Sequence, residues 1–251
     1  MTNSTETGKL YGIGVGPGNP EWLTLQAVRV LHSCQVIFAP RAQIKKESLA
    51  LEIVKPHLNP DAVIRELTFP MSKSAKVLDE AWSEAADAVE KELRAGMDVG
   101  FITIGDCMLY STYIYLKRAL EQRIPDLCSE SIPGIPAFVA AASLADIPLG
   151  EGRQPLVIVP ASGDLSRIEW ALESDGTVVV MKVGEKLPAL REILQNHNAD
   201  GPAVLASRVG LARQCIVSLE EKNRIDTETA YLSLALVPSR RNSDSELKEN
   251  P

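Results

Sequence analysis

Lys9-Leu-Tyr-Gly-Ile-Gly-Val-Gly-Pro-Gly-Asn-Pro-Glu-Trp-Leu-Thr24 is the stretch that decides the fold. It begins as a short apolar strand and continues as a loop in which every second residue from Gly12 to Gly18 is glycine. Glycine has no Cβ, so backbone or a ligand can approach such a strand end closely. Pro17 fixes a turn, and Asn19-Pro20 is typical of the start of the next element. The stretch therefore predicts a strand, a ligand-accessible loop and a helix.

Two familiar phosphate-binding loops do not fit this glycine run. A G-x-G-x-x-G dinucleotide fingerprint starting at Gly12 would need glycine where Pro17 stands, and one starting at Gly14 would need glycine where Asn19 stands. The second predicted strand also ends without an acidic residue for a ribose hydroxyl. The chain has no G-x-x-x-x-G-K-[ST] sequence. A tight structural turn that binds no ligand stays open as an alternative.

Strand-like and helix-like segments alternate along the chain, which is typical of an α/β fold with parallel strands. The predicted strands cover Leu10–Val15, Gln35–Ala39, Ala62–Leu67, Val99–Ile104, Leu156–Pro160, Thr177–Val183, Ala203–Val209, Gln214–Leu219 and Tyr231–Val237. The predicted helices cover Thr24–Ser33, Ala75–Ala95, Leu109–Glu121 and Ala137–Ala145. In the long helix, apolar residues recur every three or four positions, and Gly96 is placed to cap its end.

We expect two α/β domains, residues 1–128 and 129–251, with flexible tails at 1–8 and 239–251. The first should carry a doubly wound, mostly parallel sheet. Between Val209 and Gln214 there are too few residues for a crossover helix, so the strands on either side should pair antiparallel. The second domain should therefore carry a mixed sheet.

Composition narrows the function. The chain has 251 residues and a formal net charge of −7, which argues against a broad nucleic-acid surface. Its four cysteines form no C-x-x-C pair and its three histidines are isolated, so we expect neither a metal site nor a disulfide framework. The polar start resembles no signal peptide, and no apolar run is long enough to span a bilayer. We expect a cytoplasmic protein that works without a membrane.

A second loop follows the apolar strand at Val99–Ile104. It reads Gly105-Asp-Cys-Met-Leu-Tyr-Ser-Thr112 and leads into a helix. In open α/β sheets, ligands bind outside the carboxyl ends of the strands, where both this loop and the glycine run lie. Asp106 can alternatively serve as a helix N-cap, and Ser111 and Thr112 as ordinary helix surface.

Five segments together resemble the tetrapyrrole (corrin/porphyrin) methylase family, in its order and spacing, from about Lys9 to Pro238. They are G-x-G-x-G-P-G-N-P-E-W-L-T, G-D-x-x-L-Y-S-T, I-P-G-I-P-A, V-V-V-M-K-V-G and the late A-x-x-A-S-R-V-G. Within the family, the Leu-Tyr-Ser-Thr run, the Met-Lys pair and the Ala-Pro-Arg after the second strand are most similar to members that methylate carbon 20 of precorrin-2 or its cobalt form. That reaction belongs to cobalamin synthesis.

The resemblance implies S-adenosylmethionine as the methyl donor, bound in a cleft between the two domains, and no metal of the protein's own. The implied cofactor residues are Pro17, Ile104, Gly105, Asp106, Ser111, Thr112, Pro136, Ala137, Met181, Lys182, Ser207 and Ala230. Asp106 or Tyr110 would help to remove the proton that leaves after transfer. Met181 has the alternative of ordinary core packing on a buried strand. Homodimers are common in the family.

Two positions depart from the family pattern. Asn19 stands where the family usually has Asp, and it can still cap a turn. Cys107 stands where the family usually has Pro, and we expect the loop to be less stiff as a result.

The implied ring substrate carries eight carboxylates, so an acidic protein needs a local basic surface to hold it. Arg41 and Lys45 follow the second strand, and Lys182 and Arg208 follow later strands. Lys46, Arg153 and Arg213 are further candidates. For each of them a solvated surface charge is the alternative.

Other functions remain open from the sequence. Within the family, the chain could methylate uroporphyrinogen III, precorrin-4 or another ring. A related enzyme type methylates ribosomal RNA or a translation factor, which the acidic charge disfavours. Outside the family, a nicotinamide oxidoreductase is disfavoured by Pro17, and a non-catalytic cofactor-binding module is a further alternative.

Overall fold

The computed structural model describes residues 7–42, 48–70, 74–199, 203–220 and 232–239. The chain divides into two compact units, residues 1–136 and 137–251. The division falls after Pro136 rather than after Cys128, the boundary expected from the sequence. The reason is strand β5 (Ser129–Ile132), which pairs in parallel with β1 and so belongs to the first unit. This strand is short and polar, and the sequence pattern did not predict it.

The first unit is built on a five-stranded sheet with the order β3-β2-β4-β1-β5. Its other strands are β1 (Leu10–Gly14), β2 (Val36–Ala42), β3 (Val63–Phe69) and β4 (Val99–Thr103). Every pairing recorded in this sheet is parallel, as predicted. The central strand β4 is buried along its whole length. In a parallel sheet all carboxyl ends share one edge, so the loops after β1, β4 and β5 emerge next to one another.

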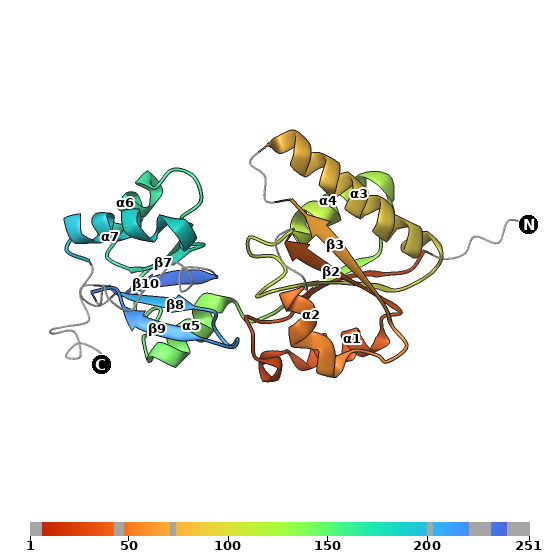
Figure 1. Cartoon of the computed structure of the whole chain (residues 1–251), viewed down its shortest axis with the longest axis horizontal. Coiled ribbons are helices and arrows are strands. Elements are labelled where there is room, and N and C mark those ends of the chain that lie inside the picture. Colours follow the sequence, from red (N-terminus) through yellow and green to blue (C-terminus); the bar gives the residue numbers. More distant parts are fainter. Residues whose placement is uncertain (1–6, 43–47, 71–73, 200–202, 221–231, 240–251) are drawn as a thin grey trace, which may run out of the picture. The chain divides into compact units, whose positions relative to one another are not determined.

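Helices cover both faces of this sheet, which confirms the doubly wound prediction. Figure 1 shows α3 (Ala75–Arg94) and α4 (Tyr113–Arg123) on one face, with α1 (Leu25–Ser33) and α2 (Leu49–Val54) on the other. Short 3-10 turns occur at Pro20–Trp22 (η1) and Lys55–His57 (η2). Helix α2 was not predicted, because six residues give too little periodicity to recognise.

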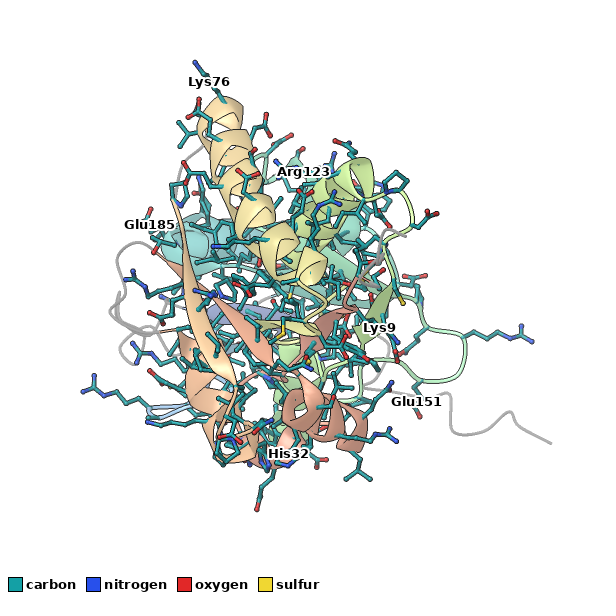
Figure 2. The ribbon with its side chains drawn as sticks, turned by 90° about the vertical axis from the view of Figure 1, so that its right-hand side faces the viewer. Lys9, His32, Lys76, Arg123, Glu151 and Glu185 are labelled. Atoms are coloured by element: carbon teal, nitrogen blue, oxygen red, sulfur yellow. The ribbon has the colours of Figure 1, made fainter. Side chains whose placement is uncertain are left out.

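The long helix α3 confirms the predicted apolar stripe. Ala85, Val89 and Leu93 are buried against the sheet and α4. Gly96 follows the helix with a left-handed φ of 79°, which suits a C-terminal cap. Arg123 of α4 reaches across to Asp87 and Ser83 of α3 and ties the two helices together (Figure 2).

Helix α4 begins at Tyr113, not at Leu109 as the sequence predicted. A turn closes first, in which the N–H of Leu109 donates to the carbonyl of Asp106. Tyr110 then adopts a left-handed φ of 51°, which a right-handed helix does not allow. The loop after β4 is therefore longer than expected.

The second unit carries a five-stranded mixed sheet, as predicted, with the order β6-β7-β10-β8-β9. Its strands are β6 (Leu156–Pro160), β7 (Thr177–Met181), β8 (Val204–Ser207), β9 (Cys215–Ser218) and β10 (Ser233–Val237). The β8–β9 pair is antiparallel, which confirms the argument from its short connection. Strand β10 runs antiparallel to both of its neighbours.

Helices α6 (Ser166–Leu172) and α7 (Leu187–Asn196) lie over one face of this second sheet, and α5 (Ala137–Ala145) lies on the other (Figure 1). A 3-10 turn, η3 (Gly184–Lys186), precedes α7. Helix α5 has its predicted bounds, whereas α6 and α7 were not predicted. The core of the unit forms where Val178 and Val180 meet Ile168 and Leu190.

Within the described ranges, no helix is both long and apolar enough to cross a membrane. The same part of the chain holds no group of three or more His, Cys, Asp or Glu side chains that could bind a metal ion.

Candidate functional site

The loops after β1 and β4 are joined by paired backbone hydrogen bonds. The N–H of Gly16 donates to the carbonyl of Gly105 at 3.1 Å, and the N–H of Gly105 donates to the carbonyl of Gly16 at 2.8 Å. Both residues have left-handed backbones, with φ of 73° and 74°. Glycine adopts this conformation without steric cost, which explains its presence at both positions. The two predicted loops are thus one connected structure.

A third glycine brings the loop after β5 into the same contact. A Cβ on Gly134 would lie 2.3 Å from the carbonyl oxygen of Gly105, and one on Gly14 would lie 2.6 Å from the backbone nitrogen of Gly134. Real Cβ atoms do not approach other atoms so closely, so the three backbones meet only because these residues have no side chain. Gly134 belongs to the I-P-G-I-P segment, but its contact with the other loops could not be inferred from sequence.

The carboxylate of Asp106 connects the loop after β4 with the loop after β5. Oδ1 accepts a hydrogen bond from the N–H of Met108 at 2.8 Å, and Oδ2 accepts one from the N–H of Gly134 at 3.0 Å. The side chain therefore caps the local turn after β4 and holds the β5 loop beside it. It does not cap α4, whose N-cap residue is Thr112.

Two residues of the first loop also anchor the site. Thr24 caps α1 by accepting from the N–H of Ala27, and its hydroxyl lies 3.4 Å from the carbonyl of Pro133. Asn19 accepts from the N–H of Glu21 and caps η1, so this departure from the family pattern keeps the capping function. Pro17, two residues before Asn19, is buried.

The predicted Tyr110-Ser111-Thr112 run is divided between exposed and buried positions. Ser111 is buried; its hydroxyl donates to Thr103 at 3.1 Å and accepts from the N–H of Tyr113 at 3.1 Å. Tyr110 is exposed and Thr112 is half-buried. Thr103, the last residue of β4, takes part in this network, although no motif or spacing in the sequence points to it.

Cys107 is buried, and its Sγ lies 3.3 Å from the carbonyl oxygen of Ile132, to which the thiol donates. Burial, with a smaller contribution from the Asp106 carboxylate, raises the pKa of the Cys107 thiol to about 11. The thiol therefore stays protonated and links the β4 loop to β5. Where the family usually has a ring that stiffens the loop, this chain has a side-chain hydrogen bond.

The ring of Tyr113 packs against the glycine run after β1. A Cβ on Gly12 would lie 2.2 Å from the ring of Tyr113, so the phenol packs directly on the glycine backbone. The ring also packs against Phe101, with centroids 6.2 Å apart. Burial raises the pKa of Tyr113 to about 12. The sequence reasoning missed this residue, because nothing in the spacing links it to Gly12.

In the second unit, the predicted residues gather at one edge of the mixed sheet. Met181 ends β7 and is half-buried, unlike the buried run Val178–Val180 before it. Lys182 follows it, exposed and with a left-handed φ of 57°. Ser207 ends β8 and is buried, and Arg208 follows with φ of 50°. This edge holds the carboxyl ends of β6, β7 and β8.

The remaining predicted residues are placed as follows. Ile104 and Pro136 are half-buried, Gly105 is buried, and Ala137 begins α5. Arg41 lies on β2, where its Nη2 donates to Thr68 at 2.9 Å and its Nε lies 3.5 Å from Glu66. Lys45 and Ala230 lie outside the described residues. Arg153 is exposed in the loop before β6.

Comparison with known proteins places this arrangement in a class of enzymes. The chain is 36% identical to the cobalt-precorrin-2 C(20)-methyltransferase of Salmonella typhimurium, over 92% of this chain and 96% of that protein. It is 33% identical to the precorrin-2 C(20)-methyltransferase of a Sinorhizobium species, over 92% and 95% of the two chains. These full-length relatives are methyltransferases, and this chain is a methyltransferase too.

A solved structure shares the fold. The uroporphyrin-III C-methyltransferase of Thermus thermophilus, solved with S-adenosyl homocysteine, has a TM-score of 0.64 and 19% identity, covering 92% of this chain and 97% of that one. Residues 9–223 match the family of Tetrapyrrole (Corrin/Porphyrin) Methylases. The chain belongs to that family, as the five motifs predicted.

Proposed function

We propose that this protein transfers a methyl group from S-adenosylmethionine to carbon 20 of precorrin-2, or of its cobalt form, in cobalamin synthesis. The observation that carries this proposal is the full-length likeness to relatives named for that reaction, at 36% and 33% identity. One relative is named for the cobalt form and the other for the metal-free form, so the likeness supports the reaction on either ring.

The loops of the first unit suit the methyl donor. Gly14 and Gly134 are packed backbone against backbone and bring the strand ends together, whereas a Cβ on Gly105 would have no neighbour nearer than 4.0 Å, so main-chain groups around Gly105 leave room for a ligand. Such groups complement the carboxylate and ammonium of S-adenosylmethionine through hydrogen bonds. The cofactor supplies an electrophilic methyl group on its sulfonium. We assign its binding in this unit to Pro17, Ile104, Gly105, Asp106, Ser111, Thr112 and Pro136.

In the second unit, we assign Ala137, Met181, Lys182, Ser207 and Ala230 to the same cofactor. The half-buried thioether of Met181 is suited to contact with an adenine face, because Met is polarizable and adapts its shape. Its backbone carbonyl accepts from the N–H of Ala161, which fixes the end of β7 and hence the direction of the side chain.

The ring substrate is expected to bind through its carboxylates. We assign Arg41, Lys45, Lys182 and Arg208 to this task. Thr68 and Glu66 hold the guanidinium of Arg41 in one orientation, so less side-chain entropy is lost when it pairs with an anion.

The two acid–base candidates differ in their surroundings. Both oxygens of Asp106 already accept backbone hydrogen bonds, so we assign Asp106 to positioning the loops. Tyr110 is exposed in the same loop, and its phenol is our candidate for relaying the departing proton: the oxygen accepts that proton while the phenolic proton passes to solvent water. The enamine-like ring carbon is already nucleophilic, so catalysis rests mainly on holding the reacting atoms in line.

The decisive experiment is to incubate the protein with S-adenosylmethionine and either the metal-free or the cobalt-bearing ring. We expect a gain of one methyl group by mass spectrometry, assigned to carbon 20 by carbon NMR. Methylation at another carbon, or of uroporphyrinogen III instead, would identify a different tetrapyrrole methylase. The absence of any methyl transfer to these rings would refute the proposal.

A ligand-binding assay distinguishes a protein that binds S-adenosylmethionine from one that binds NAD. S-adenosylmethionine should raise the melting temperature, because a ligand that binds only the folded state stabilises it by mass action. NAD should not, since Pro17 interrupts the dinucleotide fingerprint. The reverse result would favour an oxidoreductase.

We also propose that the protein works as a homodimer in the cytoplasm. The support is the resemblance to the tetrapyrrole methylase family, in which homodimers are common. Light scattering coupled to size-exclusion chromatography should give twice the mass of 27.3 kDa; the mass of a single chain would contradict the dimer.

A further inference from the structure

One edge of the second sheet carries a row of cationic residues. Because β7 and β8 run in the same direction and β9 runs opposite to β8, the ends of β7 and β8 and the start of β9 share this edge. Lys182 follows β7, Arg208 follows β8, and Arg213 precedes β9. Figure 1 shows these strands in the one sheet of the second unit, where β10 lies between β7 and β8.

All three cationic residues have left-handed backbones, with φ of 57°, 50° and 62° respectively. A long side chain in this conformation is uncommon, because its Cβ is crowded by the following carbonyl. Each strand end bends sharply at a cationic residue where glycine would fit with less strain. Leu232, just before β10 at the same edge, also has a left-handed φ, of 53°. The strained bend is therefore a feature of this edge, and it places the long cationic side chains of Lys182, Arg208 and Arg213 there.

Arg208 and Arg213 lie at the two sides of the short β8–β9 turn. Ser207 pairs with Cys215 across the hairpin, which brings the two arginines to the base of the same turn. The turn is held by hydrogen bonds from the N–H of Leu211 to Arg208 and from the N–H of Gly210 to the side chain of Gln214. The spacing of the two arginine backbones is therefore fixed by the fold.

We propose that Arg208 and Arg213 together bind the two acidic side chains of one pyrrole ring, and so make the enzyme select octacarboxylate over tetracarboxylate tetrapyrroles. This inference rests on the proposed function, because it takes a tetrapyrrole as the substrate. Planar guanidinium groups match carboxylates through paired hydrogen bonds, and two of them at a fixed spacing match an acetate and a propionate on neighbouring ring carbons. Lys182, roughly 10 Å away across the intervening strand, meets a carboxylate of a different ring.

The test uses two stable probes, uroporphyrin with eight carboxylates and coproporphyrin with four, which has only one acidic chain on each pyrrole. Dissociation constants are measured by fluorescence titration for the wild type, Arg213→Asn and Arg213→Lys. Asparagine tolerates the left-handed backbone, so this variant removes the charge without adding strain. The matched control is Arg118→Asn, which replaces an exposed arginine on α4 of the first unit.

We expect Arg213→Asn to weaken uroporphyrin binding about three- to tenfold, the range for one solvent-accessible charge-assisted contact. Coproporphyrin binding should change by less than about twofold, because its rings lack the second acidic chain. Arg213→Lys should recover part of the loss, since it keeps the charge but not the planar fork. Arg118→Asn should change neither constant.

Equal losses for both porphyrins, or no loss with Arg213→Asn, would overturn the inference. If that happened while the wild type still methylated its ring, the proposed function would stand and only the selectivity of this arginine pair would fall. A wild type that binds neither porphyrin and methylates no ring would overturn both.

Discussion

The carboxylate of Asp106 lies 3.0 Å from the backbone nitrogen of Gly134 and accepts its hydrogen bond, which joins the loop after β4 to the loop after β5. The other oxygen of the same carboxylate accepts from Met108. An aspartate that sequence alone presents as a helix cap or a base is thus part of the scaffold that shapes the proposed cofactor site. Its charge strengthens both hydrogen bonds.

Replacing Asp106 should test this positioning role. Asp106→Ala leaves two N–H groups without their acceptor, so we expect a loss of about 1–3 kcal/mol in unfolding free energy and at least about tenfold weaker S-adenosylmethionine binding. Asp106→Asn keeps one acceptor oxygen, so its unfolding free energy and its affinity for S-adenosylmethionine should lie between those of the wild type and those of Asp106→Ala. Chemical denaturation and calorimetric titration measure the two effects; unchanged affinity in the alanine variant would contradict the assignment.

A methyl group on Gly134 should separate the three loops. In Gly134→Ala the new Cβ would lie 2.3 Å from the Gly105 carbonyl oxygen, which is backbone and cannot move aside alone. We expect a lower melting temperature and loss of S-adenosylmethionine binding. Gly150→Ala is the matched control, since its Cβ would have no neighbour nearer than 3.8 Å. Similar behaviour of the two variants would show that the close approach is not required.

Stability should fall at alkaline pH because of buried thiols. Burial raises the pKa of Cys34 from 9.0 to about 12, so this thiol stays protonated in the folded state where it ionises in the unfolded chain. The unfolded state then binds fewer protons, and unfolding free energy decreases as pH rises above 9, by up to about 1.4 kcal/mol per pH unit for each such group.

Cys107 also lowers the unfolding free energy as pH rises, but over a narrower pH range, because the pKa of its thiol is raised only from 9.0 to about 11. Denaturation measured between pH 8 and 10.5 should show the decline, and Cys34→Ala should make it shallower. Cys128→Ala serves as the control, because it removes a thiol that is exposed rather than buried. A slope that Cys34→Ala does not alter would refute this assignment.

Arg41 provides a test of substrate binding apart from cofactor binding. Arg41→Ala should weaken tetrapyrrole binding several-fold, because one preoriented guanidinium is lost. S-adenosylmethionine affinity should stay within about twofold, since Arg41 makes its contacts with Thr68 and Glu66 rather than with the glycine loops. Thr68→Val, which removes only the anchor, should have a smaller effect in the same direction. Equal losses for both ligands would contradict the assignment.

Local patterns predicted the parts of the fold that depend on neighbouring residues. The strand and loop from Lys9 to Thr24, the apolar stripe of α3 with its Gly96 cap, and the antiparallel β8–β9 pair all agree with the structure. Each follows from short-range geometry: glycine frees the backbone, helical periodicity sets one apolar face, and a connection without room for a crossover helix enforces an antiparallel pair.

Short or polar elements escaped prediction. Strand β5 has four residues, of which only Ile132 is buried, and α2, α6 and α7 have six, seven and ten residues, so their patterns are too brief to rise above chance. Because β5 was not predicted, the expected domain boundary falls after Cys128, whereas the structure divides after Pro136. The strand is held in place by pairing with β1, which lies more than a hundred residues earlier.

The sequence by itself determined the family, the order of most of the strands and helices, and the kinds of residue that reach the strand ends. Only the tertiary structure decided how those ends meet: that Gly14, Gly105 and Gly134 touch, that Asp106 reaches Gly134, and that Tyr113 fills the space against Gly12. The physical reason is that residue type and spacing fix local conformation, whereas contacts between distant segments arise when the sheet assembles and brings the carboxyl ends of its parallel strands to one edge.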